Sequence, residues 1–177
     1  KRVRTETRVN EGAVSVASVA VALVKKIFDN LAHCQALLLG AGETGELVAR
    51  SLLSNGLTSL VVANRTPERA RALAEAFGAR TAHFSKLEEA LASADIVICA
   101  TGAPEPILTA EMLSRAMDRR DGRMLAAIDI SVPRNIDPRA DSIEQLFVYD
   151  MDALEEVCEE NRRRRRAEIG KAEAIVE

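Results

Sequence analysis

The sequence predicts an α/β fold, a doubly wound parallel sheet followed by a long C-terminal helix. Short apolar segments that suit buried strands alternate with segments that suit helices, a pattern typical of parallel sheets covered on both faces. A glycine-rich turn joins the first strand to the next helix. From residue 151 onward glutamate, arginine and alanine dominate, which predicts a long exposed helix. Six strands are expected, at residues 37–39, 60–63, 81–83, 95–100, 124–130 and 146–149.

The turn after the first strand carries the pattern Gly-x-Gly-x-x-Gly, and a helix is expected after it over residues 46–55. Gly40 permits a tight turn, Gly42 lets the backbone approach a pyrophosphate, and Gly45 lets the helix lie close to the strand. The helix N-terminus presents free N–H groups and the positive end of its dipole to phosphates. This order of elements indicates a Rossmann-type dinucleotide site. Its expected contacts here are Gly40, Ala41, Gly42, Glu43, Thr44 and Gly45.

Ligands of doubly wound sheets bind beyond the carboxyl ends of the strands. The second expected strand runs into Asn64, Arg65 and Thr66, and the fourth into Thr101 and Gly102. NAD-binding domains usually carry an acidic residue at the end of the second strand, where it holds the ribose 2′-hydroxyl. Asn64 occupies that position, and the guanidinium of Arg65 suits a 2′-phosphate. All five residues are therefore expected to contact NADP(H) in preference to NAD(H); the alternative is that Arg65 is a surface arginine beside a helix N-cap.

Residues that favour helix ends mark the boundaries of the later helices. Thr66 suits an N-cap, and Gly78 suits the end of the same helix. Ser85 and Glu88 have the spacing of a capping box that would open the next helix. Thr109 is expected to cap the helix after it.

The composition suits one domain of ordinary size with an extension at each end. The chain has 177 residues, of which 47% are hydrophobic and 3% aromatic, so a full and mainly aliphatic core is expected. Residues 1–35 are expected to form a linker and a packing helix, residues 36–150 the NADP-binding domain, and residues 151–177 the start of a long connecting helix.

Side chains suited to acid–base or nucleophilic chemistry are few and scattered. The histidines and cysteines are His33, His83, Cys34, Cys99 and Cys158, whose spacing favours neither a metal site nor a disulfide framework and fits a reducing cytoplasm. Cys99 lies within an expected buried strand, where a thiolate is disfavoured. Asp129 ends a strand at the correct edge, but one carboxylate does not make a mechanism. No catalytic residue and no metal ligand is assigned.

Charge and hydropathy restrict the partners. The net charge of −3 excludes a general affinity for nucleic acids and leaves only local contacts. The basic run Arg162–Arg166 lies between acidic residues on the expected tail helix, and it is either a solvated surface or a contact for RNA phosphates. The most apolar stretch, Val14–Val24, is shorter than the ~20 residues of a membrane helix. We expect a cytoplasmic location and no membrane partner.

These motifs, together with the N-terminal segment, resemble the central domain of glutamyl-tRNA reductases. The resemblance runs in register from about Lys1 to Asp150, and the tail resembles the start of that family's long connecting helix. It implies NADPH as cofactor and reduction of glutamyl-tRNA to glutamate-1-semialdehyde, the first committed step of one route to tetrapyrroles such as porphyrins. The matching segments are Lys1–Thr7, Gly12–Ser18, Gly40–Gly45, Asn64–Pro67, Ala100–Gly102 and Asp129–Arg134.

The resemblance also implies that parts of the reductase lie outside this chain. In the family, a cysteine of an N-terminal domain attacks the aminoacyl ester, and hydride then releases the aldehyde from the thioester. The subunits form a V-shaped dimer through a C-terminal domain. None of the three cysteines here matches the family nucleophile, so the chain alone is expected to be inactive. The implied partners are glutamyl-tRNA, a second subunit and an aminomutase that acts downstream.

Two other functions stay open. A shikimate-dehydrogenase-like NADP oxidoreductase shares the Gly-Ala-Gly turn and the Asn-Arg-Thr sequence. Its substrate domain, with a lysine/aspartate pair, should precede the glycine turn, whereas 36 residues precede the first strand here. A non-catalytic RNA-binding module would grip RNA through Arg162–Arg166 and keep a vestigial nucleotide fold. Salt-dependent affinity for tRNA that falls when these arginines are replaced would identify it.

Overall fold

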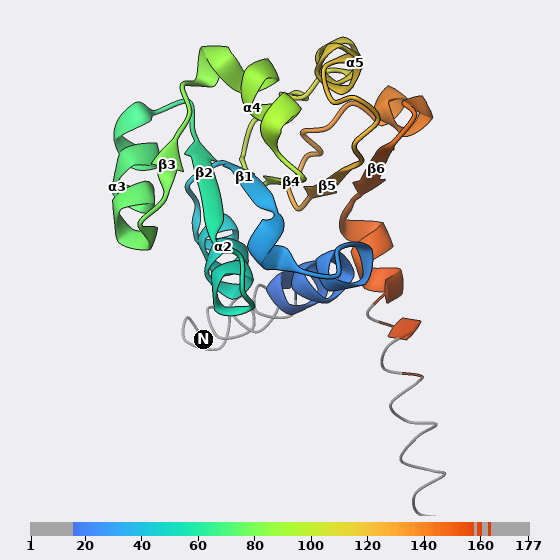
Figure 1. The fold of residues 1–177 in the computed structure, drawn as a ribbon, viewed down its shortest axis with the longest axis horizontal. Helices are drawn as coiled ribbons and strands as arrows, with labels where there is room; N and C mark the ends of the chain where they lie inside the picture. Colours follow the sequence, from blue (N-terminus) through green and yellow to red (C-terminus); the bar gives the residue numbers. More distant parts are fainter. Residues whose placement is uncertain (1–15, 158, 161–162, 164–177) are drawn as a thin grey trace, which may run out of the picture.

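The structure, a computed structural model, describes residues 16–157, 159–160 and 163. Within them, six parallel strands form one sheet in the order β3-β2-β1-β4-β5-β6 (Figure 1). The expected doubly wound α/β sheet is therefore confirmed, with all six expected strands in place. The strands are β1 (Gln35–Leu39), β2 (Ser59–Ala63), β3 (Arg80–Thr81), β4 (Ile96–Cys99), β5 (Leu125–Asp129) and β6 (Leu146–Tyr149).

Helices connect the strands and cover both faces of the sheet (Figure 1). Two further helical segments flank the sheet in sequence: the N-terminal helix, described over residues 16–27, and the C-terminal helix, described over residues 151–157, 159–160 and 163. The other α-helices are α2 (Glu43–Ser54), α3 (Pro67–Phe77), α4 (Leu87–Ser93) and α5 (Ala110–Asp118). Three short 3₁₀ helices are η1 (Leu31–His33), η2 (Phe84–Lys86) and η3 (Pro138–Ser142).

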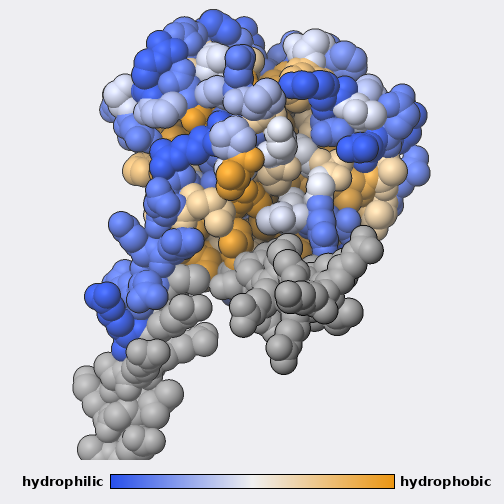
Figure 2. All heavy atoms as spheres, turned by 180° about the vertical axis from the view of Figure 1, so that it is seen from behind, coloured by the Kyte–Doolittle hydropathy of each residue, from blue (hydrophilic) through white to orange (hydrophobic). Residues whose placement is uncertain are grey.

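The strands carry buried side chains on both faces, because successive residues point to opposite sides of a sheet. Leu38 and Ile98 pack into a cluster with the N-terminal helix, α2 and α3. Leu37 and Val97, one residue earlier in each strand, pack into a second cluster with α4, α5 and η3. Both clusters are mainly aliphatic, as the composition predicts. On the outside, hydrophilic side chains cover most of the face in Figure 2, with hydrophobic ones gathered near its middle.

The ends of two helices agree with the sequence, and the start of a third differs from the expected one. Gly78 ends α3 in the left-handed conformation, with φ of 61°. The hydroxyl of Thr109 accepts the N–H of Met112 at 3.2 Å and so caps α5. Helix α2 begins at Glu43, three residues before the expected start. Gly42 is its N-cap, so Gly45 lies inside its first turn.

The expected capping box at Ser85 and Glu88 is wrong. Ser85 lies in η2, and the imidazole Nδ1 of His83 accepts its backbone N–H at 3.3 Å. Helix α4 begins only at Leu87, and no side chain caps it. The turn of 3₁₀ helix takes the place of the cap, so the hydroxyl of Ser85 is too far back in the chain to cap α4.

The two ends of the chain are described only in part. The linker expected over residues 1–15 and most of the expected tail helix, including four of the five arginines of the run 162–166, lie outside the described residues. The division of the chain into three segments therefore stays a prediction. Among the residues that are described, no helix is both long and apolar enough to cross a membrane.

Candidate functional site

The turn between β1 and α2 lies next to the end of β4. Gly40 has φ of +104°, and a Cβ there would lie 2.2 Å from the carbonyl oxygen of Ala100. A Cβ on Gly45 would lie 2.8 Å from the Cβ of Ala100 and 3.2 Å from Cδ1 of Leu38. Gly42, the N-cap of α2, has no neighbour closer than 4.0 Å, and no side chain caps the helix. The first and third glycines are thus required by packing, and the second leaves the helix N-terminus open.

The residues after β2 lie beside this turn. Asn64 donates from Nδ2 to the carbonyl oxygen of Thr66 at 3.1 Å, which fixes the backbone between them. Thr66 is the N-cap of α3, as expected, but its hydroxyl makes no capping bond. Arg65 is exposed, and among the described residues its guanidinium forms neither an ion pair nor a hydrogen bond. A cation without a partner beside an uncapped helix N-terminus is suited to a phosphate.

The loop after β4 is held by buried polar residues. The backbone N–H of Thr101 donates to the hydroxyl of Ser131 at 3.2 Å, and the Thr101 hydroxyl donates to Oδ1 of Asn135. The same hydroxyl accepts the N–H of Ala103 at 3.1 Å. The loop therefore has a defined conformation although it contains no helix or strand.

These three segments meet at one hollow of about 190 Å³ at the carboxyl edge of the sheet. Five of the sequence-predicted residues line it: Gly40, Asn64, Arg65, Thr101 and Gly102. The other predicted contacts do not line this hollow but follow directly in the same segments: Ala41, Gly42, Glu43, Thr44, Gly45 and Thr66. The structure thus brings together strand ends that are far apart in the sequence.

Four further residues, which were not predicted from the sequence, also line the hollow. They are Phe84, Ala103, Pro104 and Ile107. Phe84 comes from η2, which follows β3, and no local motif marks it. Ala103 and Pro104 directly follow Thr101-Gly102, so extending that loop by two residues would have included them. Together they give the hollow an apolar part of its lining, as suits the ring of a nucleotide base.

Asp129 ends β5 at this edge, but its carboxylate is occupied by backbone groups. It is 1% exposed and accepts the N–H groups of Ser131 at 3.0 Å, Asn135 at 2.7 Å and Ile136 at 2.8 Å. These bonds fold the segment that leaves β5 back on itself. Asp129 therefore holds the structure of this segment together.

The described cysteines are buried, and the described histidines do not line the hollow. Cys99 is fully buried in β4; burial, and next to it the charge of Asp129, raises the pKa of its thiol well above the ordinary value. Burial likewise raises the pKa of Cys34, which precedes β1. Neither histidine lines the hollow: His33 ends η1 before β1, and His83 caps η2. Within the described residues no group of three or more His, Cys, Asp or Glu could hold a metal ion.

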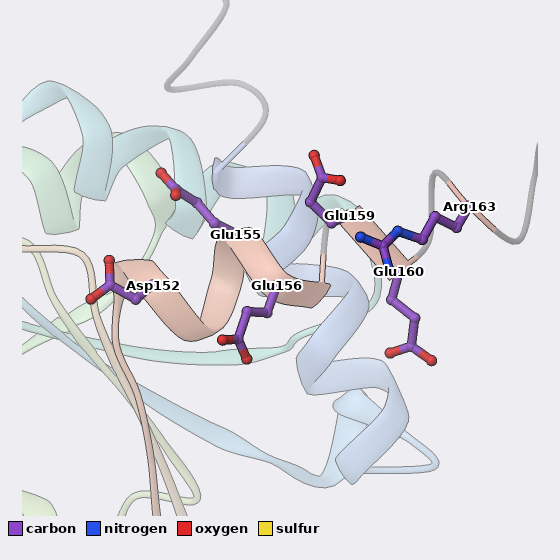
Figure 3. A pocket seen from close by; sticks show the side chains of 6 residues that line it. All are labelled: Asp152, Glu155, Glu156, Glu159, Glu160 and Arg163. Atoms are coloured by element: carbon purple, nitrogen blue, oxygen red, sulfur yellow. The ribbon is translucent and has the colours of Figure 1, made fainter.

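Two other hollows are poorly suited to a dinucleotide. The larger, of about 470 Å³, lies along the C-terminal helix (Figure 3). Five of its six side chains are carboxylates, which repel phosphates: it is lined by Asp152, Glu155, Glu156, Glu159, Glu160 and Arg163. The smaller, of about 90 Å³, lies between Asp129 and the start of the C-terminal helix, with Asp137, Asp141 and Asp150 in its wall.

The fold and the site together define a class of protein. A six-stranded parallel sheet in this order, a glycine turn that leads into a helix N-terminus, and a hollow at the switch point of the strands are the features of a Rossmann-type dinucleotide-binding domain. Comparison with known proteins gives the family. A family model described as shikimate / quinate 5-dehydrogenase matches residues 22–157, which is more than half of the chain. The chain belongs to this family.

The relatives that match over the whole chain are glutamyl-tRNA reductases. That of Syntrophus aciditrophicus (strain SB) is 49% identical over 177 residues, which is 100% of this chain and 42% of the relative. The chain thus spans about two fifths of the length of the curated relatives it matches. The resemblance inferred from the sequence is confirmed; within the matched family, the shikimate dehydrogenases themselves are related to this chain more distantly, through the fold.

Solved structures agree with this result. The glutamyl-tRNA reductase from Methanopyrus kandleri has a TM-score of 0.82 and 41% identity, over 98% of this chain and 44% of that one. The nucleotide binding domain of glutamyl-tRNA reductase from Thermoplasma volcanium has a TM-score of 0.64 and covers 85% of this chain and 96% of that one. At 21% identity, the second likeness concerns the fold alone.

Proposed function

We propose that this chain is the NADPH-binding domain of a glutamyl-tRNA reductase. The observation that carries the proposal is the convergence of three strand ends on one hollow, with the unpaired guanidinium of Arg65 in its wall. The fit is supported by the glycine turn, where Gly42 has no neighbour closer than 4.0 Å and the N-terminus of α2 has no side-chain cap. Similarity to glutamyl-tRNA reductases over the whole chain supports the choice of enzyme.

Each segment has a distinct part in binding. The pyrophosphate would lie against the backbone at Gly42 and the open N-terminus of α2, where N–H groups and the helix dipole favour negative charge. Arg65 and Thr66 would hold the 2′-phosphate, because a guanidinium donates two parallel hydrogen bonds to phosphate oxygens. Thr101 and Gly102 would bound the same cleft on the side of β4.

The proposed reaction divides between this chain and the rest of the protein. NADPH, when bound, supplies the hydride that reduces the glutamyl group of glutamyl-tRNA. The residues of this chain bind and orient the dinucleotide. The attacking cysteine would lie in an N-terminal domain outside this chain, as the resemblance implies; among the described residues, Cys34 and Cys99 are both buried. We further propose a homodimeric, cytoplasmic reductase that passes its product to an aminomutase.

The test is calorimetric titration of the 177-residue chain with NADPH and with NADH, repeated on Arg65→Ala. A charge-assisted hydrogen-bond pair is worth about 1.5–3 kcal/mol, so NADPH should bind roughly tenfold to a hundredfold more tightly than NADH. The Arg65→Ala variant should lose that difference.

Arg80→Ala is the matched control, because it removes the same charge near the amino ends of the strands, away from the hollow. Arg80 donates to Gln35 at 2.6 Å, at the first residue of β1. The control should bind NADPH as the wild type does. Equal affinity for NADPH and NADH in the wild type, or no binding of either, would contradict the proposal.

A further inference from the structure

Asn135 is a fully buried polar residue in the segment that leaves β5, and it does not line the nucleotide hollow. Its side-chain oxygen accepts the hydroxyl of Thr101. Its Nδ2 donates to the carbonyl oxygen of Ala103 at 3.1 Å, with a longer contact to that of Glu105 at 3.4 Å. A side chain from the segment that follows β5 thus forms hydrogen bonds with the loop that follows β4.

The backbone of Asn135 strengthens the same connection. Its carbonyl oxygen accepts the N–H groups of Ile107 at 2.8 Å and Leu108 at 3.0 Å. Its own N–H donates to the carboxylate of Asp129 at 2.7 Å, which anchors it to the end of β5. The loop over residues 101–107 is therefore held at both of its ends by one residue.

The loop needs such support because it has no regular secondary structure. It contains Gly102, which meets nothing within 4 Å of its ideal Cβ, and two prolines that cannot donate backbone hydrogen bonds. A loop that must be ordered on binding costs conformational entropy, which weakens affinity, whereas a loop ordered beforehand does not.

We propose that Asn135 is a positioning residue of the dinucleotide site. It does not touch the nucleotide; it fixes Thr101, Ala103 and Ile107, which do line the hollow. This inference rests on the proposed binding of NADPH and adds a residue to it that no local motif marks.

The decisive comparison is between two buried polar residues, one beside the carboxyl ends of the strands and one beside their amino ends. Arg120 is also fully buried and donates to the carbonyl oxygens of Leu91 at 2.8 Å and Met124 at 2.5 Å, near the starts of β4 and β5. Asn135→Ala and Arg120→Met should both lower the midpoint of thermal unfolding, because each leaves buried carbonyl groups without donors. Only Asn135→Ala should weaken NADPH binding, by about tenfold, measured by calorimetry well below both midpoints.

Asn135→Asp preserves the shape of the side chain. It should also make the affinity for the dinucleotide depend on pH, which a purely structural role would not do. The carboxylate can still accept from Thr101 but cannot donate to Ala103, and burial beside the carboxylate of Asp129 favours its protonated form. A protonated carboxyl group can donate again. The ratio of the variant's dissociation constant for NADP⁺ to that of the wild type should therefore fall as the pH is lowered from about 8 to about 6.

Each outcome has a definite meaning. Wild-type affinity in Asn135→Ala, an equal loss of affinity in Arg120→Met, or a pH-independent ratio for Asn135→Asp would overturn the positioning role while the proposed function stands. Absence of NADPH binding to the wild type in the same titration would overturn both. If Asn135→Ala does not fold, the pH series on Asn135→Asp decides between a positioning and a structural role.

Discussion

The α-carbon of Gly40 faces the carbonyl oxygen of Ala100 so closely that an added Cβ would lie 2.2 Å away. Gly45 meets the side chain of the same residue, with 2.8 Å between its ideal Cβ and that of Ala100. The end of β4 therefore packs directly on the glycine turn. Gly42 has no such neighbour closer than 4.0 Å and has φ of −93°, which any residue can adopt.

This difference separates Gly40 and Gly45, which packing against Ala100 requires, from Gly42, beside which we propose that the pyrophosphate lies. Gly40→Ala should lower the free energy of unfolding by more than about 2 kcal/mol, since a positive φ alone costs an L-residue ~1–2 kcal/mol. Gly42→Ala should change stability by less than about 1 kcal/mol, yet weaken NADPH binding because its methyl group meets the pyrophosphate. Urea denaturation and calorimetric titration of both variants check this. Wild-type affinity in Gly42→Ala would contradict the proposed position of the pyrophosphate.

Asp129 should contribute to stability rather than to chemistry. Replacing it with asparagine turns one of its acceptor oxygens into a donor that faces the N–H groups of Ser131 or of Asn135 and Ile136. Asp129→Asn should therefore lower the free energy of unfolding by about 2 kcal/mol in urea denaturation. Asp118→Asn, at an exposed position at the end of α5, is the control and should stay within about 0.5 kcal/mol of the wild type. An unchanged stability of Asp129→Asn would contradict the structural role.

Asp137 should make the free energy of unfolding depend on pH in the acid range. Hydrogen bonds from the side chain and the backbone N–H of Arg139 lower the pKa of Asp137 from 3.8 to about 2. Because the folded pKa lies below the unfolded one, the unfolded chain binds more protons in this range, and stability is lost as the pH falls from about 4 to about 2. The free energy of unfolding of Asp137→Asn, measured against pH, should lack this part of the decline. Curves of equal slope for variant and wild type would show that the carboxylate is not stabilised.

The thiol of Cys99 should be unreactive in the folded chain. Burial raises its pKa, so little thiolate forms at neutral pH, and the side chain is fully buried. Iodoacetamide at about pH 8 should leave Cys99 unmodified in peptide mapping by mass spectrometry, and should modify it when urea is added. Rapid modification in the folded chain would reopen the question of a nucleophile in this chain.

Much of the fold could be predicted from local patterns. The apolar runs around Leu38 and Ile98 gave the strands, and Gly78 and Thr109 gave helix ends, because these signals depend on neighbours in the chain. The prediction at Ser85 failed because the imidazole of His83, two residues earlier, makes the bond that a serine hydroxyl would make at a helix start.

The site was predictable only where a motif names the residue. The glycine turn and Arg65 follow from the chemistry of phosphates, and Thr101 follows from its place at a strand end. Phe84 and Asn135 act through contacts that join distant segments, so no window of sequence identifies them.

The three strand ends should form one dinucleotide site, which NMR titration of the isotope-labelled chain with NADPH can detect residue by residue. The backbone amide signals of residues 40–45, 64–66 and 101–102 should shift together with one dissociation constant. Those of Gln35, Asp95 and Arg120, near the amino ends of the strands, should not shift. Shifts confined to other regions, such as the acidic C-terminal helix, or different dissociation constants for the three segments, would show that the strand ends do not form one site.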